Sequence, residues 1–177
     1  MEKATFAAGC FWGVEAAFRQ VEGVLDTAVG YTGGKLESPT YKEVCTDRTG
    51  HAEAIEVTFD PARVSYDKLL DVFWKVHDPT TLNRQGADVG TQYRSVIFYH
   101  SPAQKQTAEQ LIAELRETDP WGRPIVTELT AAPTFYKAEE YHQGYFRQNP
   151  MQPYCQAVVA PKVAKLRQHF AAKLREA

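Results

Sequence analysis

The order of the apolar segments constrains the fold of this chain more than any other feature of its sequence. Four short segments have the apolar and β-branched content of buried strands: residues 4–8, 24–32, 52–59 and 94–100. Segments with apolar residues at helical spacing separate the first strand from the second and the third from the fourth: about 11–22 and from Ser65 onward. This order is that of the split βαββαβ arrangement. We therefore predict an α+β fold, a two-layer sandwich whose mixed, mainly antiparallel sheet has a ferredoxin-like core.

Further elements and long functional loops are predicted beyond this core. Ser101-Pro102 begins a helix, a short strand follows at about 125–129, and the last helix carries Val163, Leu166, Phe170 and Leu174. Two irregular stretches, about 33–51 and 78–92, are too long for plain connections, and such loops usually carry function. Without an internal repeat or a clear boundary, residues 1–177 are expected to form a single domain, with 149–177 as a C-terminal segment.

Charge and hydropathy exclude several classes of partner. The formal net charge is −2, and lysine and arginine form no cluster, so nucleic acid is not an expected partner. No apolar run approaches the roughly 20 residues of a membrane span, and the first residues lack the features of a signal peptide. We therefore expect no membrane association and a cytoplasmic location. The cysteines, Cys10, Cys45 and Cys155, lack zinc-ligand spacing, so no metal is predicted.

Cys10 is the first candidate for chemistry. It lies in Gly9-Cys10-Phe11-Trp12-Gly13, between the first strand and the first turn of the following helix. Backbone N–H groups and the positive end of the helix dipole favour a thiolate there, and the thiolate is the nucleophilic form of cysteine. Phe11 lies near the edge of the apolar stripe, whereas Trp12 points to the opposite side. Trp12 therefore lines an apolar pocket in front of the sulfur or packs under a loop.

Glu53 is the second candidate. Alternation along strand 52–59 puts Glu53 on the same face as Ile55, Val57 and Phe59. Desolvation on that face raises the pKa of a carboxyl group, and a carboxylic acid that stays protonated can act as a general acid. An ordinary carboxylate that reaches water from the end of the strand satisfies the same pattern.

Other polar groups lie in the irregular stretches and before the last helix. Tyr41 and Tyr93 are candidate neutral hydrogen-bond donors, and Asp88 either binds a substrate N–H group or forms a turn. Cys155 follows two prolines in a segment expected to be mobile. There it either forms a disulfide with an oxidised thiol or stays an unpaired surface cysteine. Cys45 is expected to be a small buried hydrophobe without a role in chemistry.

Several motifs occur in a fixed order along the chain. They are Gly9-Cys10-Phe11-Trp12-Gly13, Gly30-Tyr31-Thr32-Gly33-Gly34, Pro39-Thr40-Tyr41, Gly50-His51-Ala52-Glu53, Gly90-Thr91-Gln92-Tyr93-Arg94-Ser95, and Asn149-Pro150 followed by Tyr154-Cys155. From about residue 4 to residue 155 they resemble the A-type peptide methionine sulfoxide reductases. These enzymes reverse the oxidation of methionine to one epimer of its sulfoxide.

The resemblance implies a mechanism. Cys10 would attack the sulfoxide sulfur as a thiolate, and Glu53 would protonate the leaving oxygen with the help of hydrogen bonds from Tyr41 and Tyr93. Cys155 would then turn the Cys10 sulfenic acid into a disulfide, which thioredoxin or another dithiol reduces. The implied enzyme repairs oxidised proteins and acts on the S epimer of methionine sulfoxide, free or in peptides. It needs no metal or organic cofactor.

The resemblance also implies contacts with the substrate. Phe11 and Trp12 would enclose the terminal methyl group, and Asp88 would help to hold the main chain. The chain departs from many relatives at Val89, where they have a polar residue. After Cys155 it also lacks a glycine-rich tail with another cysteine. A single resolving thiol is therefore expected.

Two other classes of function remain open on the sequence alone. A cysteine hydrolase or transferase needs a histidine base, and His142 is the formal candidate, although its sequence neighbours give no support. A non-catalytic peptide-binding module would use Phe11 and Trp12 as an apolar cup for methionine. Of these three classes of protein, only a reductase would consume thiol for each sulfoxide that it reduces.

Overall fold

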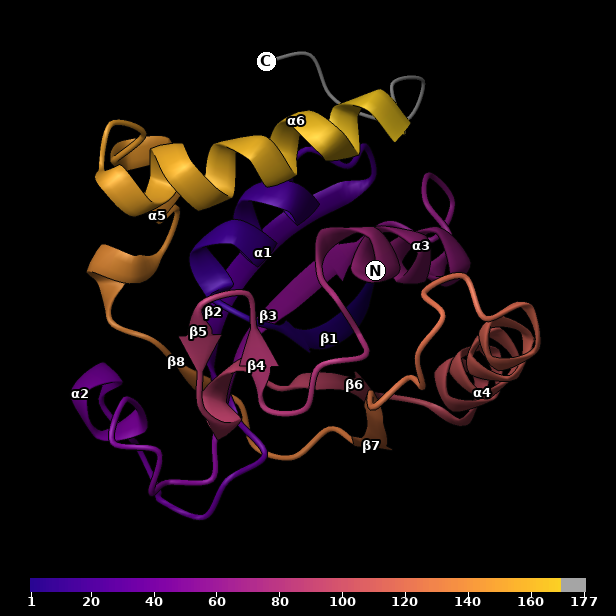
Figure 1. Cartoon of the computed structure of the whole chain (residues 1–177), viewed down its shortest axis with the longest axis horizontal. Helices are drawn as coiled ribbons and strands as arrows, with labels where there is room; N and C mark the ends of the chain where they lie inside the picture. Colours follow the sequence, from indigo (N-terminus) through magenta and orange to yellow (C-terminus); the bar gives the residue numbers. More distant parts are fainter. Residues whose placement is uncertain (170–177) are drawn as a thin grey trace.

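A six-stranded sheet forms the centre of the structure, a computed structural model that describes residues 1–169 (Figure 1). Its strands follow the order β7-β6-β1-β3-β2-β8, and β4 and β5 form a separate two-stranded ladder. The bounds of the strands are β1 Glu2–Ala8, β2 Val24–Thr32, β3 Ala52–Phe59, β4 Arg84–Gln85, β5 Asp88–Val89, β6 Ser95–Tyr99, β7 Glu128–Ala131 and β8 Tyr136–Lys137.

The helices surround this sheet. The α-helices are α1 Phe11–Arg19, α2 Tyr41–Val44, α3 Tyr66–Val76, α4 Pro102–Thr118, α5 Tyr145–Gln148 and α6 Ala160–His169. Short 3₁₀ helices are η1 Thr91–Tyr93 and η2 Glu140–His142, and η3 Cys155–Val159 is a π-helix. None of the helices in residues 1–169 combines the length and the apolar character that crossing a membrane requires.

The sheet confirms the predicted fold class. Strands β1, β2, β3 and β6 are those of the split βαββαβ arrangement. Within the sheet, β3 pairs antiparallel with both β1 and β2, and β1 pairs antiparallel with β6. Only the pairing of β6 with β7 is parallel, which makes the sheet mixed but mainly antiparallel.

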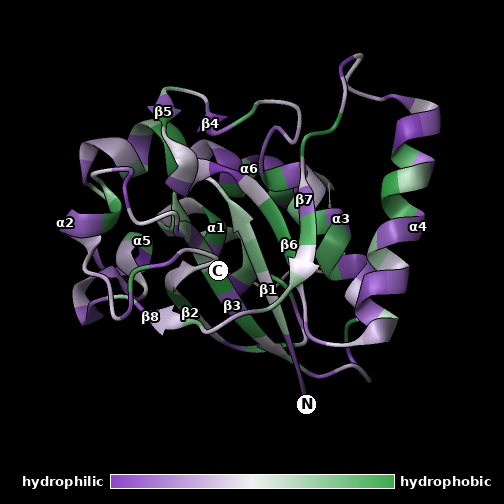
Figure 2. Ribbon diagram, turned by 90° about the horizontal axis from the view of Figure 1, so that it is seen from below, coloured by the Kyte–Doolittle hydropathy of each residue, from purple (hydrophilic) through white to green (hydrophobic). Residues whose placement is uncertain are grey.

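The central strands are rich in hydrophobic residues (Figure 2), and apolar side chains lie on both faces of the sheet. One face packs against α1 and α3 in the main core, which includes Phe6, Ile55 and Phe59. The other face is made of small and aromatic residues of β1, β3 and β6, and Ala132 and Phe135 from the chain after β7 cover it. The alternation along β3 therefore decides which of its side chains face α1, and this places Glu53 on the helix side.

The sequence patterns predicted where most helices begin, but they did not predict the end of every helix and strand. Ser65 and Ser101 cap α3 and α4, because their hydroxyl groups accept N–H groups three residues later. The first helix ends at Arg19 rather than near 22, and the strand expected at 125–129 lies at Glu128–Ala131. In the last helix Val163 and Leu166 are buried, whereas Phe170 and Leu174 lie outside the described residues.

Candidate active site

The turn from β1 into α1 places Cys10 at the start of the helix. Gly9 has a φ of +94°, and a Cβ there would lie 2.8 Å from Cγ of Gln85, so only glycine fits this turn. Cys10 is the N-cap residue of α1, and its carbonyl oxygen accepts the N–H groups of Gly13 and Val14. The half-buried thiol therefore lies beside the first turn of the helix, as predicted.

The helix start acts on the Cys10 thiol in the predicted direction, but burial has the larger effect on its pKa. Burial raises the pKa of Cys10 well above its ordinary range, and the carboxyl groups of Glu53 and Asp88 raise it further. A hydrogen bond from the backbone of Trp12 does lower the pKa, which is the effect expected of the helix start, but burial outweighs it. In this site burial therefore favours the thiol over the thiolate.

Glu53 lies within the same site on the helix-facing side of β3. It is only 1% exposed, and its Oε1 accepts the backbone N–H of Phe11 at 3.1 Å. Burial raises its pKa to about 8 despite this hydrogen bond. Oε2 is buried and has no hydrogen-bond partner among the described residues. The carboxyl group is therefore mostly protonated at neutral pH, with one oxygen available to a ligand.

Tyr41 and Tyr93 approach this acid from the two long loops. Burial, followed by the charge of Glu53, raises the pKa of both phenols, so both keep their protons. Tyr41 begins α2, and Glu139 fixes this point by accepting the Tyr41 N–H at 3.0 Å and the Tyr31 hydroxyl at 2.9 Å. Two neutral hydrogen-bond donors thus lie in the electrostatic neighbourhood of Glu53.

An aromatic cluster adjoins the first turn of α1 and includes a histidine that sequence reasoning set aside. His142 is fully buried, and its ring centroid lies 5.1 Å from that of Phe11 and 4.4 Å from that of Tyr41. The indole N–H of Trp12 donates to His142 Nδ1 at 2.9 Å. Because Nδ1 accepts and burial lowers the pKa of His142, the ring is neutral and carries its proton on Nε2.

His142 is therefore not arranged as a base for Cys10. No hydrogen bond joins Cys10 to a histidine within residues 1–169, and the acceptor nitrogen of His142 is already engaged by Trp12. No feature of the sequence around His142 indicated this structural role. The arrangement does not support the hydrolase alternative.

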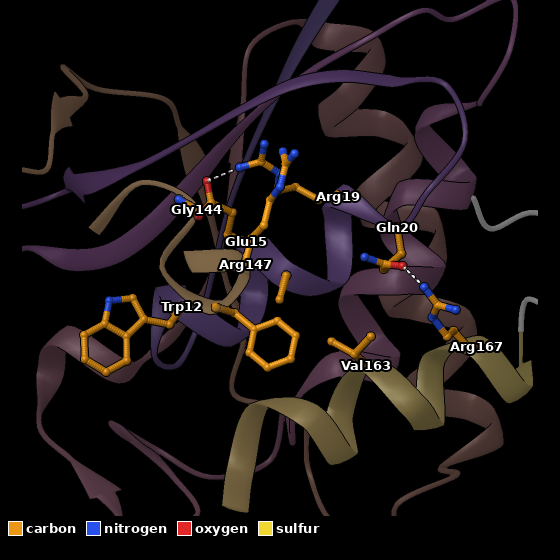
Figure 3. Close-up of a pocket in the computed structure, with 10 residues that line it drawn as sticks. Trp12, Glu15, Arg19, Gln20, Gly144, Arg147, Val163 and Arg167 are labelled. Carbon is orange, nitrogen blue, oxygen red and sulfur yellow. Dashed lines mark hydrogen bonds and ion pairs between the residues drawn. The ribbon is translucent and has the colours of Figure 1, made fainter. Parts of the chain in front are cut away.

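The other side of Trp12 faces helix α5 and a cavity. The indole stacks on Tyr145 with the ring centroids 3.8 Å apart. A cavity of about 570 Å³ lies between α1, α5 and α6, with Trp12 at one end and the hydrogen-bonded pair of Gln20 and Arg167 at the other (Figure 3). Neither Cys10 nor Glu53 lines this cavity.

Tyr154 reaches the site from the C-terminal segment, and the sequence analysis missed it. Its hydroxyl group donates its one hydrogen to Asp88 Oδ2 at 2.6 Å. The same hydroxyl group lies near the thiol of Cys10 and lowers the pKa of that thiol. In the sequence, the one indication that Tyr154 belongs to the site is its position next to Cys155. The structure thus brings Cys10, Asp88 and Tyr154 together.

The other two cysteines differ from expectation. Cys155 is completely buried in η3, where it packs in a cluster with Ala16, Val159 and Val163, so it is not a surface cysteine. Cys45 is exposed rather than buried, because α2 projects from the sheet on its long loop (Figure 1). All three cysteines are unpaired. Cys10 and Cys155 are therefore not joined by a disulfide in this structure.

Comparison with known proteins identifies the family. The family model described as Peptide methionine sulfoxide reductase matches residues 2–174. The chain belongs to this family. Peptide methionine sulfoxide reductase MsrA of Deinococcus radiodurans is 55% identical to this reductase over 98% of the chain and 84% of that protein. The A-type family that the motifs resemble is thereby confirmed, and with it the enzymatic activity rather than a binding module.

Solved structures agree with this assignment. The reduced form of Mxr1 from Saccharomyces cerevisiae matches the reductase with a TM-score of 0.79 and 39% identity, covering 87% of this chain and 88% of that one. Mxr1 in complex with Trx2 matches with a TM-score of 0.56 and 28% identity, over 81% of this chain and 84% of that one.

Proposed function

We propose that this reductase converts methionine sulfoxide to methionine through a nucleophilic Cys10 and a protonated Glu53. The hydrogen bond from the Phe11 N–H to Glu53 Oε1 carries the proposal. It ties a buried acid on the sheet to the residue that follows the thiol on the helix. An electrophilic sulfur and the oxygen bonded to it can then meet the thiol and the acid at the same time.

The proposed first step transfers the sulfoxide oxygen to Cys10. The Cys10 sulfur attacks the sulfoxide sulfur while Glu53 gives its proton to the oxygen, and the proton lost from the thiol restores the acid. The sulfur–oxygen bond of the substrate and the new sulfur–sulfur bond then break, and the oxygen becomes bonded to the Cys10 sulfur. Methionine leaves, and Cys10 is a sulfenic acid. Tyr41 and Tyr93 donate hydrogen bonds to the same oxygen.

Substrate contacts follow from the surrounding residues. Phe11 and Trp12 enclose the methyl group of the substrate, with His142 holding the indole of Trp12 by the hydrogen bond at Nδ1. Asp88 accepts a main-chain N–H of the substrate. Because Tyr154 already donates to Oδ2 of Asp88, the substrate uses the other oxygen or displaces the phenol. The chiral arrangement of these groups selects the S epimer, free or in peptides and proteins.

The proposed second step closes the cycle. The thiol of Cys155 attacks the Cys10 sulfenic acid, water leaves, and a disulfide forms. A dithiol then reduces this disulfide by exchange. The complex of the related Mxr1 with Trx2 supports thioredoxin as that dithiol, and a reducing compartment such as the cytoplasm would supply it.

The test is a single-turnover assay with a racemic sulfoxide. Cys10→Ser is expected to yield no methionine, because its hydroxyl group is a far weaker nucleophile than a thiolate. The matched control, Cys45→Ser, changes the exposed cysteine and is expected to keep the wild-type rate. Chiral analysis of the remaining substrate is expected to show only the R epimer. Methionine formation by Cys10→Ser at the wild-type rate would refute the proposal.

A further inference from the structure

A basic side chain from the last helix reaches the first turn of α1. Helix α6 lies across α1 (Figure 1), and Lys162 is in its first turn. The Cδ atom of Lys162 lies 3.8 Å from the place that a Cβ on Gly13 would occupy. The aliphatic part of the lysine therefore lies against the turn that begins at Cys10.

The charged and titratable groups around Lys162 come from several elements. Its ammonium group interacts electrostatically with Cys10 before α1 and with Asp88 of β5, and it acts on His77 at the end of α3. Glu53 of β3 also acts on Cys10. His77 stays neutral, because burial lowers its pKa to about 4.

The position of Lys162 is energetically unfavourable for its charged ammonium group. Burial lowers the pKa of its ammonium group, and it makes no ion pair with any residue of the described chain. A charge withdrawn from water without a direct partner costs free energy. Negative charge on Cys10 would compensate for this cost. That charge develops only when the thiol ionises.

We propose that Lys162 is a positioning residue for the reaction, whose ammonium group holds negative charge on the Cys10 sulfur against the neighbouring carboxylate of Asp88. The inference rests on the proposed function, because it takes Cys10 as the nucleophile. Lys162 does not touch the sulfoxide. It acts through the sulfur, in a partly buried site where charges interact more strongly than in water.

The test measures the ionisation of Cys10 without any turnover. In a background of Cys45→Ser and Cys155→Ser, only Cys10 reacts with iodoacetamide. Lys162→Met is expected to slow this alkylation about tenfold between pH 7 and 10, which corresponds to a rise of about 1 in the apparent pKa of the thiol. Lys162→Arg is expected to keep most of the rate. Lys165→Met, which removes an exposed lysine from the same helix, is the control for net charge and is expected to change nothing.

Reductase assays separate the possible outcomes. The proposal expects Lys162→Met to lower the single-turnover rate at saturating sulfoxide, with KM little changed. An unchanged alkylation rate overturns it, and an unchanged alkylation rate with a raised KM would assign Lys162 to Asp88 instead. If Lys162→Met does not fold, Lys162→Gln serves in its place. If the Cys10→Ser variant keeps its reductase activity, the proposed function is refuted. The alkylation measurement on Lys162→Met is independent of that result.

Discussion

Replacing Glu53 by glutamine tests the buried acid through both stability and rate. The ordinary pKa of a glutamate is 4.5, and burial raises that of Glu53 to about 8. Between these two pH values the folded protein holds a proton that the unfolded chain has lost. Stability is therefore full below pH 4.5 and falls as the pH rises toward 8. At about 1.4 kcal/mol per pH unit, the wild type loses about 4–5 kcal/mol over this interval.

Glu53→Gln removes the proton and with it this loss of stability. The amide oxygen can still accept the Phe11 N–H, while the buried NH₂ group costs about 1–3 kcal/mol at every pH. The test therefore compares how the stability of each protein changes with pH, and not its absolute stability. Urea unfolding at several pH values between 5 and 9 is expected to show a falling midpoint for the wild type and a flatter one for the variant.

The same variant is expected to be a poor enzyme. Loss of a general acid typically slows the chemical step by roughly 10²–10⁴-fold, which a rapid-quench single-turnover assay measures. The control is Glu56→Gln on the same strand, which loses only an ion pair of 3.1 Å with Lys3. Wild-type and Glu53→Gln stability curves that run parallel from pH 5 to 9 would show that Glu53 is not a buried neutral acid.

Two further variants probe the resolving thiol and the sheet. Cys155→Ser, with Cys155→Ala as a second form, is expected to release about one methionine per enzyme and then stop when thioredoxin is the reductant, and sustained thioredoxin-driven cycling would contradict this role. Gly30→Ala is expected to destabilise the fold by about 1–3 kcal/mol in urea unfolding. Its Cβ would lie 2.3 Å from the carbonyl oxygen of Tyr136, whereas Gly13→Ala, with its nearest contact at 3.6 Å, should be tolerated.

Local patterns predicted the sheet and the positions of Cys10 and Glu53 in their elements. The alternation that set Glu53 beside Ile55 is a property of one strand, so it needed no tertiary information. The caps at Ser65 and Ser101 are equally local. Cys10 could be placed at a helix start because the apolar stripe of α1 begins beside it.

The remaining features depend on segments that are distant in the sequence. The pKa of Cys10 follows from burial and from carboxyl groups on β3 and β5, which outweigh the local effect of the helix. His142 and Tyr154 enter the site from the chain after β8, where the sequence has turns and aromatic residues but no clear period. The burial of Cys155 likewise depends on how η3 packs against α1.

The complete burial of Cys155 has a consequence for an enzyme that works among oxidants. Peroxides and other small electrophiles attack cysteines that are ionised and accessible, and this thiol is neither, because burial also raises its pKa. Between rounds of repair it is shielded from the damage that the enzyme reverses in other proteins. In the proposed mechanism, the electrophile that this thiol attacks is the sulfenic acid that catalysis forms on Cys10.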